Sequence, residues 1–155
     1  MTQAHIHLLF NHFPILGTLF GILILGYGTL RGNRQVQTTA YLLFILSALG
    51  GVIAYATGDG AEELVEDLAG VTHRALEDHE DSGKYALVAS GILGLLSVAG
   101  AILGRIKSDY RSRMAIGIGL FSLLTLAIAA RTGYLGGKIR HTELYAPQEA
   151  ESEKP

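Results

Sequence analysis

The chain has 155 residues, of which 49% are hydrophobic and 17% charged, and it has no cysteine, no tryptophan and a formal net charge of -2. Soluble domains carry about 25% charged residues. Here the charge is missing from four stretches that contain no Asp, Glu, Lys or Arg, namely residues 2–30, 35–58, 85–104 and 114–130. Because every helix of a soluble bundle needs a polar face, this pattern argues against a soluble globular domain. The lack of cysteine excludes disulfides, thiolate metal sites, iron–sulfur clusters and c-type haem.

Each charge-free stretch is long enough for a transmembrane helix, which needs about 20 mostly apolar residues. The sequence therefore predicts an all-α fold, an integral membrane four-helix bundle formed by one domain, residues 1–146. The expected spans are residues 8–30, 36–57, 83–104 and 114–135. The first is expected to be a retained helix, because no Lys or Arg precedes Arg31 and its apolar run is too long for a signal peptide. Small residues predict tight helix contacts at Gly17, Gly21, Gly117 and Ser122.

The segment between the second and third spans, residues 58–82, is acidic and helical in pattern. Ala61, Leu64, Val65 and Leu68 recur at helical spacing among acidic residues, which predicts a short amphipathic helix. A second helical pattern begins near Thr72 and leads into the third span, so we expect one helix without a break there. The acidic tail, residues 147–155, is predicted to be disordered.

The charges also predict how the chain crosses the membrane. Both short loops, residues 31–34 and 105–113, are basic, whereas the segment 58–84 holds nine acidic and two basic residues. By the positive-inside rule, the short loops face the cytoplasm. We therefore expect a multi-pass protein of the bacterial inner membrane, with both termini and the acidic segment outside.

Under this topology all six histidines fall at the outer end of the bundle. We expect His5, His7 and His73 to be exposed and His79, on an apolar stripe, to face the bundle. His12 and Arg131 are expected to share one depth near the outer boundary of the hydrocarbon. Ionisable groups at membrane depth are costly and tend to mark sites of binding or transfer.

Two kinds of cofactor site follow from ligand chemistry, and neither includes a catalytic residue. Haem b takes axial imidazoles from two helices and needs cations near its propionates. Its predicted binding residues are His12, His79, His141 and Arg131. Alternatively, iron, copper or zinc suits imidazole and carboxylate ligands, and the candidate metal ligands are His12, His79, His141, Glu63, Glu66 and Glu80. No spacing among them matches an established metal motif.

Of the other classes of function, one remains open and the rest are disfavoured. A cofactor-free scaffold subunit, whose acidic outer helix docks a partner, is the main alternative. An ion transporter is disfavoured because the middle and inner parts of the spans carry no ionisable residues except tyrosines. A nucleophilic enzyme has little support, and no basic stripe indicates nucleic acid. The expected partners are the lipid bilayer, a redox or respiratory complex, and further copies of the chain.

Short motifs, taken in order, resemble a family of bacterial predicted four-helix membrane proteins classed as a domain of unknown function. These are His12-Phe13-Pro14, the stretch Thr57-Gly58-Asp59-Gly60-Ala61-Glu62-Glu63-Leu64-Val65-Glu66, the pair His79-Glu80, and the ending Thr132-Gly133-Tyr134-Leu135-Gly136-Gly137 with His141. The resemblance covers residues 5 to 141. It implies a four-span inner-membrane domain with histidines at its outer ends and an association with haem or redox chemistry, and it implies no particular reaction.

Overall fold

The computed structural model describes residues 1–106 and 108–142, and every regular element in this part of the chain is a helix. The four long helices are α2 (Phe13–Leu30), α3 (Arg34–Ala56), α5 (His73–Ile106) and α6 (Ser108–Arg140), and the two short ones are α1 (Gln3–Phe10) and α4 (Asp59–Glu62). Four helices, with α1 and α2 counted as one, are long and apolar enough to cross a membrane. The all-α, four-span prediction is confirmed. The tail predicted to be disordered lies outside the described residues.

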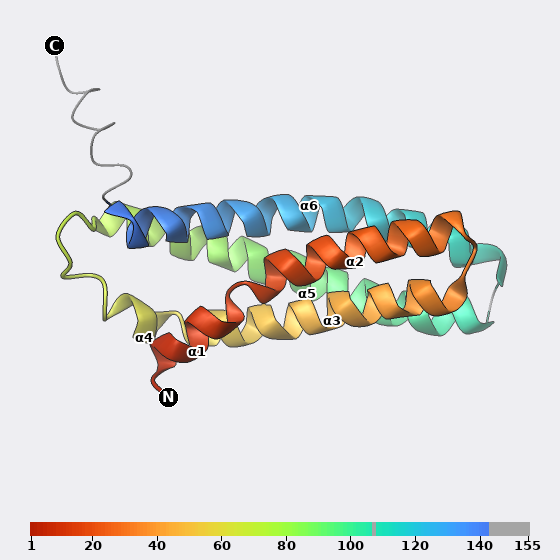
Figure 1. Cartoon of the computed structure of the whole chain (residues 1–155), viewed down its shortest axis with the longest axis horizontal. Coiled ribbons are helices and arrows are strands. Elements are labelled where there is room, and N and C mark those ends of the chain that lie inside the picture. The colour runs from red at the N-terminus through yellow and green to blue at the C-terminus, as the bar shows by residue number, and fades with distance from the viewer. Residues whose placement is uncertain (107, 143–155) are drawn as a thin grey trace, which may run out of the picture.

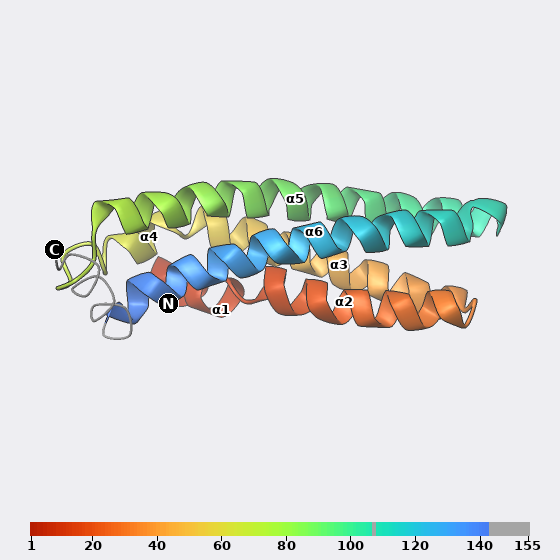
Figure 2. The ribbon, with the colours of Figure 1, turned by 90° about the horizontal axis from the view of Figure 1, so that it is seen from above.

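The long helices form an antiparallel bundle in which each packs against two neighbours (Figures 1 and 2). The pairs in contact are α2 with α3, α3 with α5, α5 with α6, and α6 with α2. Short connections join α2 to α3 and α5 to α6 at one end, here called the short-turn end. The opposite end, called the α4 end, holds α1, α4 and the described termini.

Large apolar side chains face outward along the whole bundle, as expected for contact with lipid. Leu23, Leu95 and Leu120 are between 60% and 73% exposed, whereas the buried residues are mainly alanine, serine, threonine and glycine. One cluster of larger side chains, including Phe44 and Leu93, fills the centre. Small residues let helices approach closely in lipid, where apolar side chains gain nothing by turning inward.

The first predicted span is interrupted near its start. Pro14 lies in the first turn of α2, where its missing amide N–H costs nothing, but a helix running through it would lack one backbone hydrogen bond. The helix is interrupted at Asn11 and His12, and α1 continues beyond the break in nearly the direction of α2, in contact with α3 and α4 (Figures 1 and 2). Thr2 caps α1 by accepting a hydrogen bond from the amide of His5 at 3.4 Å. This separate helix was not expected from the sequence.

The acidic segment forms a shorter helix than its apolar pattern predicts. The helix α4 ends at Glu62, and turns follow as far as Leu68. Leu64 and Leu68 are 63% and 50% exposed, so the apolar face of the predicted helix has little protein surface to pack against. A short helix in water depends on such packing for its stability. In contrast, α5 runs unbroken from His73 into the bundle, which confirms the expected continuous helix.

The predicted tight contacts are only partly present. A Cβ atom at Gly17 would lie 3.1 Å from Ser47 Cβ, and one at Gly21 would collide with the ring of Phe44. Both glycines therefore lie in the close α2–α3 contact. Gly117 is different, because it is exposed and nothing lies within 4 Å of a Cβ placed there. The expectation for Gly117 is wrong: this glycine faces away from the neighbouring helices.

Candidate functional site

The α4 end gathers the histidines, because it combines α1, the beginnings of α2 and α5, and the end of α6 (Figure 1). His5, His12 and His73 are exposed, as is His141 just beyond α6. His7 and His79 are half-buried. The two half-buried imidazoles are therefore the best-positioned groups for a site inside the protein.

His79 lies between α5 and α6, as expected from its place on the apolar stripe. Its Nδ1 donates a hydrogen bond to the carbonyl oxygen of Thr132 at 3.1 Å. A Cβ at Gly136 would lie 3.0 Å from His79 Cε1, so this glycine provides the space for the ring. A carbonyl oxygen can only accept a hydrogen bond, and therefore Nδ1 carries the proton. In the neutral imidazole this leaves the lone pair on Nε2.

Thr132, which orients His79, is itself fixed by hydrogen bonds. Its hydroxyl donates to the carbonyl oxygens of Ser82 at 3.0 Å and Ile128 at 3.1 Å. Ser82 Oγ and Thr132 Oγ1 lie 2.8 Å apart and share a hydrogen bond. These contacts join α5 to α6 one turn from His79. They resemble the outer hydrogen bonds that usually orient histidine ligands in metal sites.

His7 is held in the same way from the other side of the bundle. Its Nδ1 donates to the carbonyl oxygen of Ala54 near the end of α3, at 2.8 Å. The proton is again on Nδ1, and Nε2 bonds to no other described residue. The expectation that His7 is exposed is wrong, because α1 packs against α3 and the His7 ring is half-buried.

Burial lowers the pKa of the His79 imidazole, and a charge on His7 acts weakly in the same direction. The two imidazoles come from helices more than 60 residues apart in sequence, and each has its Nδ1 occupied by a backbone carbonyl. Sequence reasoning missed His7. Pro14 in the sequence could have indicated it, because proline favours the first turn of a helix. The residues before Pro14 can then form a separate short helix.

Two other predicted haem residues, His12 and Arg131, are exposed. His12 is the N-cap residue of α2, but its side chain makes no capping hydrogen bond. The side chains of His12 and Arg131 make no contact with other described residues through hydrogen bonds or charge. His141 is exposed, and its amide donates to Gly137 O at 2.9 Å. Of the histidines at this end, His7 and His79, and not His12, are held by hydrogen bonds to the backbone of another helix.

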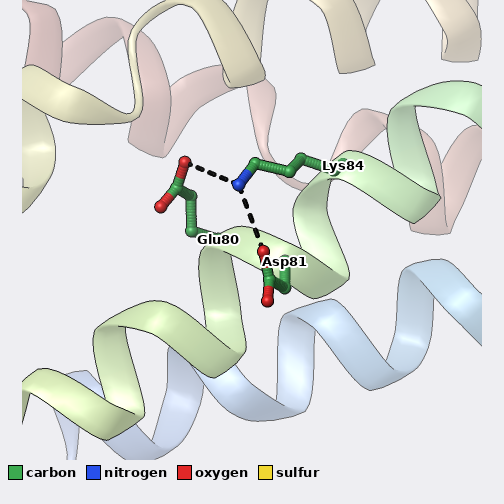
Figure 3. A network of polar contacts seen from close by, with 3 residues as sticks. All are labelled: Glu80, Asp81 and Lys84. Carbon is green, nitrogen blue, oxygen red and sulfur yellow. Dashed lines mark hydrogen bonds and ion pairs between the residues drawn. The ribbon is translucent and has the colours of Figure 1, made fainter.

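The predicted carboxylate ligands lie in an acidic hollow of about 290 Å³. Glu63, Glu66 and Glu80 line it together with Asp59 and Glu62. Glu80 is paired on its own helix with Lys84, whose Nζ lies 3.2 Å from Glu80 Oε1 and 3.1 Å from Asp81 Oδ1 (Figure 3). Within residues 1–106 and 108–142, no three His, Asp or Glu side chains are arranged to hold a metal ion. The mixed set of histidines and glutamates is not brought together.

The fold and this end of the bundle define the class: a multi-pass helical membrane protein with a polar, histidine-bearing cluster at one end. Comparison with family models, curated proteins and solved structures finds no match to this chain. The resemblance noted from the motifs therefore stays a prediction.

Proposed function

We propose that this protein holds haem b or another metal at the α4 end of its bundle and serves electron transfer in the membrane, as a subunit or partner of a respiratory complex. The observation that carries the proposal is the state of His79. Its Nδ1 donates a hydrogen bond to Thr132 O, and on this half-buried ring Nε2 makes no hydrogen bond to any residue that the structure describes. Neutral imidazole oriented in this way is the commonest protein metal ligand.

The proposal includes the orientation inferred from charge, in which the α4 end faces the periplasm. The short-turn end carries Arg31, Arg34, Arg105 and Arg113, whereas the α4 end carries the acidic hollow. With cytoplasmic loops enriched in Lys and Arg, the short-turn end is the cytoplasmic one. The metal group would then lie at the periplasmic surface of the inner membrane, where a soluble or membrane-bound redox partner can approach.

Replacing His79 tests the proposal. The full chain is produced in cells supplied with haem, purified in detergent, and studied by reduced-minus-oxidised spectra and elemental analysis. We expect a metal or haem signal in the native protein and its loss in His79→Ala. His73→Ala is the matched control, because His73 is on the same helix but exposed, and its signal should equal that of the native protein. A folded native protein without haem or metal would refute the proposal.

The cofactor-free scaffold is the second candidate, and the acidic hollow favours it. Its five carboxylates come from two separate parts of the chain, around α4 and on α5. Such a surface suits a basic partner. In that case, metal analysis stays blank, and replacing Glu62, Glu63 and Glu66 together by glutamine weakens a complex isolated from the membrane.

A further inference from the structure

We propose that an apolar hollow between α5 and α6, near the short-turn end, binds one acyl chain of an anionic phospholipid whose phosphate is held by Arg113. This inference is independent of the proposed cofactor and concerns the opposite end of the bundle. Three observations carry it: the size and lining of the hollow, an exposed glycine with no packing contact, and an unpaired cation one helical turn away. Together they suit a molecule that is apolar at one end and negative at the other.

The hollow lies where α5 and α6 run side by side toward their short connection (Figures 1 and 2). Its volume is about 200 Å³, and it is lined by Leu96 of α5 and by Met114, Gly117 and Ile118 of α6. Pockets for small molecules usually measure about 300–1,000 Å³ and contain a few polar groups. A smaller hollow with a wholly apolar lining, on a pair of membrane-spanning helices, suits a hydrocarbon chain.

Gly117 has no packing role inside the protein. It is exposed, and nothing lies within 4 Å of a Cβ placed there. Glycine weakens a helix relative to alanine, and no close helix contact requires it at this position. The residues that continue the same face of α6, Leu120 and Leu124, are large and more than half exposed. The missing side chain of Gly117 instead leaves space in the hollow that a larger residue would fill.

Arg113 supplies the charge that an anionic headgroup needs. It precedes Gly117 by four residues, so the two share one face of α6 and lie about 6 Å apart along its axis. Arg113 is exposed, and its guanidinium pairs with no residue that the structure describes. It directly precedes the charge-free stretch 114–130, at the level where lipid headgroups lie. Because a guanidinium binds phosphate oxygens through parallel hydrogen bonds, an acyl chain in the hollow has its phosphate within reach of Arg113.

The charge of the loop before this face favours an anionic lipid over a neutral one. Residues 105–113 include four basic residues and one acidic residue. Basic residues next to a membrane span attract anionic headgroups. One of them, Arg111, is already engaged, because its Nη2 donates to Gly32 O at 3.3 Å. Arg113, on the face that carries Gly117, keeps its guanidinium for a phosphate.

A second copy of the chain fits this face less well. Exposed glycines let transmembrane helices approach closely, and a two-fold symmetric contact sets equivalent residues opposite each other. A parallel contact centred on Gly117 would bring two Arg113 side chains together, and their like charges repel. Close helix dimers also have a small residue four positions further on, where this chain has Phe121. An anionic lipid replaces the repulsion by attraction.

The experiment measures lipid binding to the full chain purified in detergent. Dioleoyl phosphatidylglycerol and dioleoyl phosphatidylcholine, which share their acyl chains and differ in headgroup charge, are titrated separately, and bound lipid is counted by native mass spectrometry. The native chain should bind phosphatidylglycerol more tightly. Arg113→Gln should weaken this binding about fivefold, the usual effect of one basic residue beside an anionic surface, and Arg113→Lys should retain most of it. Gly117→Leu should also weaken it, because leucine fills the hollow.

Arg34→Gln and Gly26→Leu are the matched controls. Arg34 is an exposed arginine at the same end of the bundle, and Gly26 is an exposed glycine with nothing within 4 Å of a Cβ. Both variants should bind phosphatidylglycerol as the native chain does. Gly117→Leu should unfold at or above the native midpoint, since leucine favours a helix over glycine.

Four outcomes would overturn the proposal. These are equal affinity of the native chain for the two lipids, unchanged binding in Gly117→Leu, an effect of Arg113→Gln no larger than that of Arg34→Gln, and a native dimer that Gly117→Leu dissociates. The last would make the hollow an interface between copies of the chain. None of these measurements involves haem or metal content, so this inference and the proposed function fail separately.

Discussion

Several glycines in this bundle matter because, lacking a side chain, they leave space for a ring of a neighbouring helix. Gly136 makes room for the ring of His79, and Gly21 makes room for Phe44, which is fully buried in the central cluster. A methyl group at Gly21 would have to displace an aromatic ring held between helices. Packed cores respond to such added volume with strain, because they contain few voids.

Gly21→Ala should therefore destabilise the protein by about 1–3 kcal/mol, the usual cost of overpacking. Gly26→Ala is the matched control on the same helix, since a Cβ there meets nothing within 4 Å. Alanine favours a helix over glycine by up to about 1 kcal/mol, so Gly26→Ala should be neutral or slightly stabilising. Thermal unfolding of both variants in the same detergent measures the difference. Equal midpoints for the two variants would contradict the α2–α3 contact.

The ion pairs of Lys84 contribute little to the stability of the protein. Its ion pairs with Glu80 and Asp81 are formed within one helix, and the side chains are between 49% and 68% exposed. Exposed pairs of this kind are worth about 0–1 kcal/mol. Their effect on the site is on position, because the ion pair holds the Glu80 carboxylate against Lys84 on the same helix, α5 (Figure 3).

Among the elements, α1 decides the composition of the candidate site. Its presence depends on Pro14, and its direction depends on contacts with α3 and α4. The first candidate span runs from Gln3 to Leu30, and the structure adds a short break within it, at Asn11 and His12. Composition reports that a segment is apolar, whereas the angle between two helices depends on the surfaces they meet.

The docking of α1 on α4 can be tested by cross-linking, because the native chain has no cysteine. Gln3→Cys with Gly60→Cys places two thiols in contact, within a small backbone adjustment of the Cβ separation of about 3.8 Å that a disulfide needs. We expect an intramolecular disulfide on mild oxidation, seen as a mobility shift in non-reducing electrophoresis. Gln3→Cys with Gly83→Cys is the control and should not close, since nothing lies within 4 Å of a Cβ at Gly83. Closure of both pairs to the same extent would indicate that α1 is not docked.

At the scale of the whole molecule, polarity is arranged in layers. In the middle of the bundle, large apolar side chains face outward and mainly small residues pack around one central cluster of larger ones; the two ends differ in charge. At the short-turn end, Arg111 Nη2 donates to Gly32 O at 3.3 Å and so ties α6 to the turn after α2, where Gly32 has a positive φ of 61°. The same end carries the basic loops, on which the proposed orientation in the membrane is based.

This direction can be measured with reporters. Alkaline phosphatase fused after Pro155 should be active, because it folds outside the cytoplasm. The same enzyme inserted after Gly32, in the exposed turn between α2 and α3, should be inactive. Green fluorescent protein at the two positions should give the opposite result. Active phosphatase at Gly32 would reverse the assigned orientation and place the histidines in the cytoplasm.

The sequence by itself determined the features that depend on local composition. Four apolar stretches define four spans, because lipid requires long uninterrupted apolar helices. The charges of the loops indicate which ends share a side, and the stripe on α5 placed His79 toward its neighbours. Only the tertiary structure decided that His7 is held on the end of α3, that Gly21 rather than Gly117 is a tight contact, and that the glutamates line a separate hollow. The physical reason is that these relations depend on which helices become neighbours and at what angle they meet, and no periodicity within one segment contains that information.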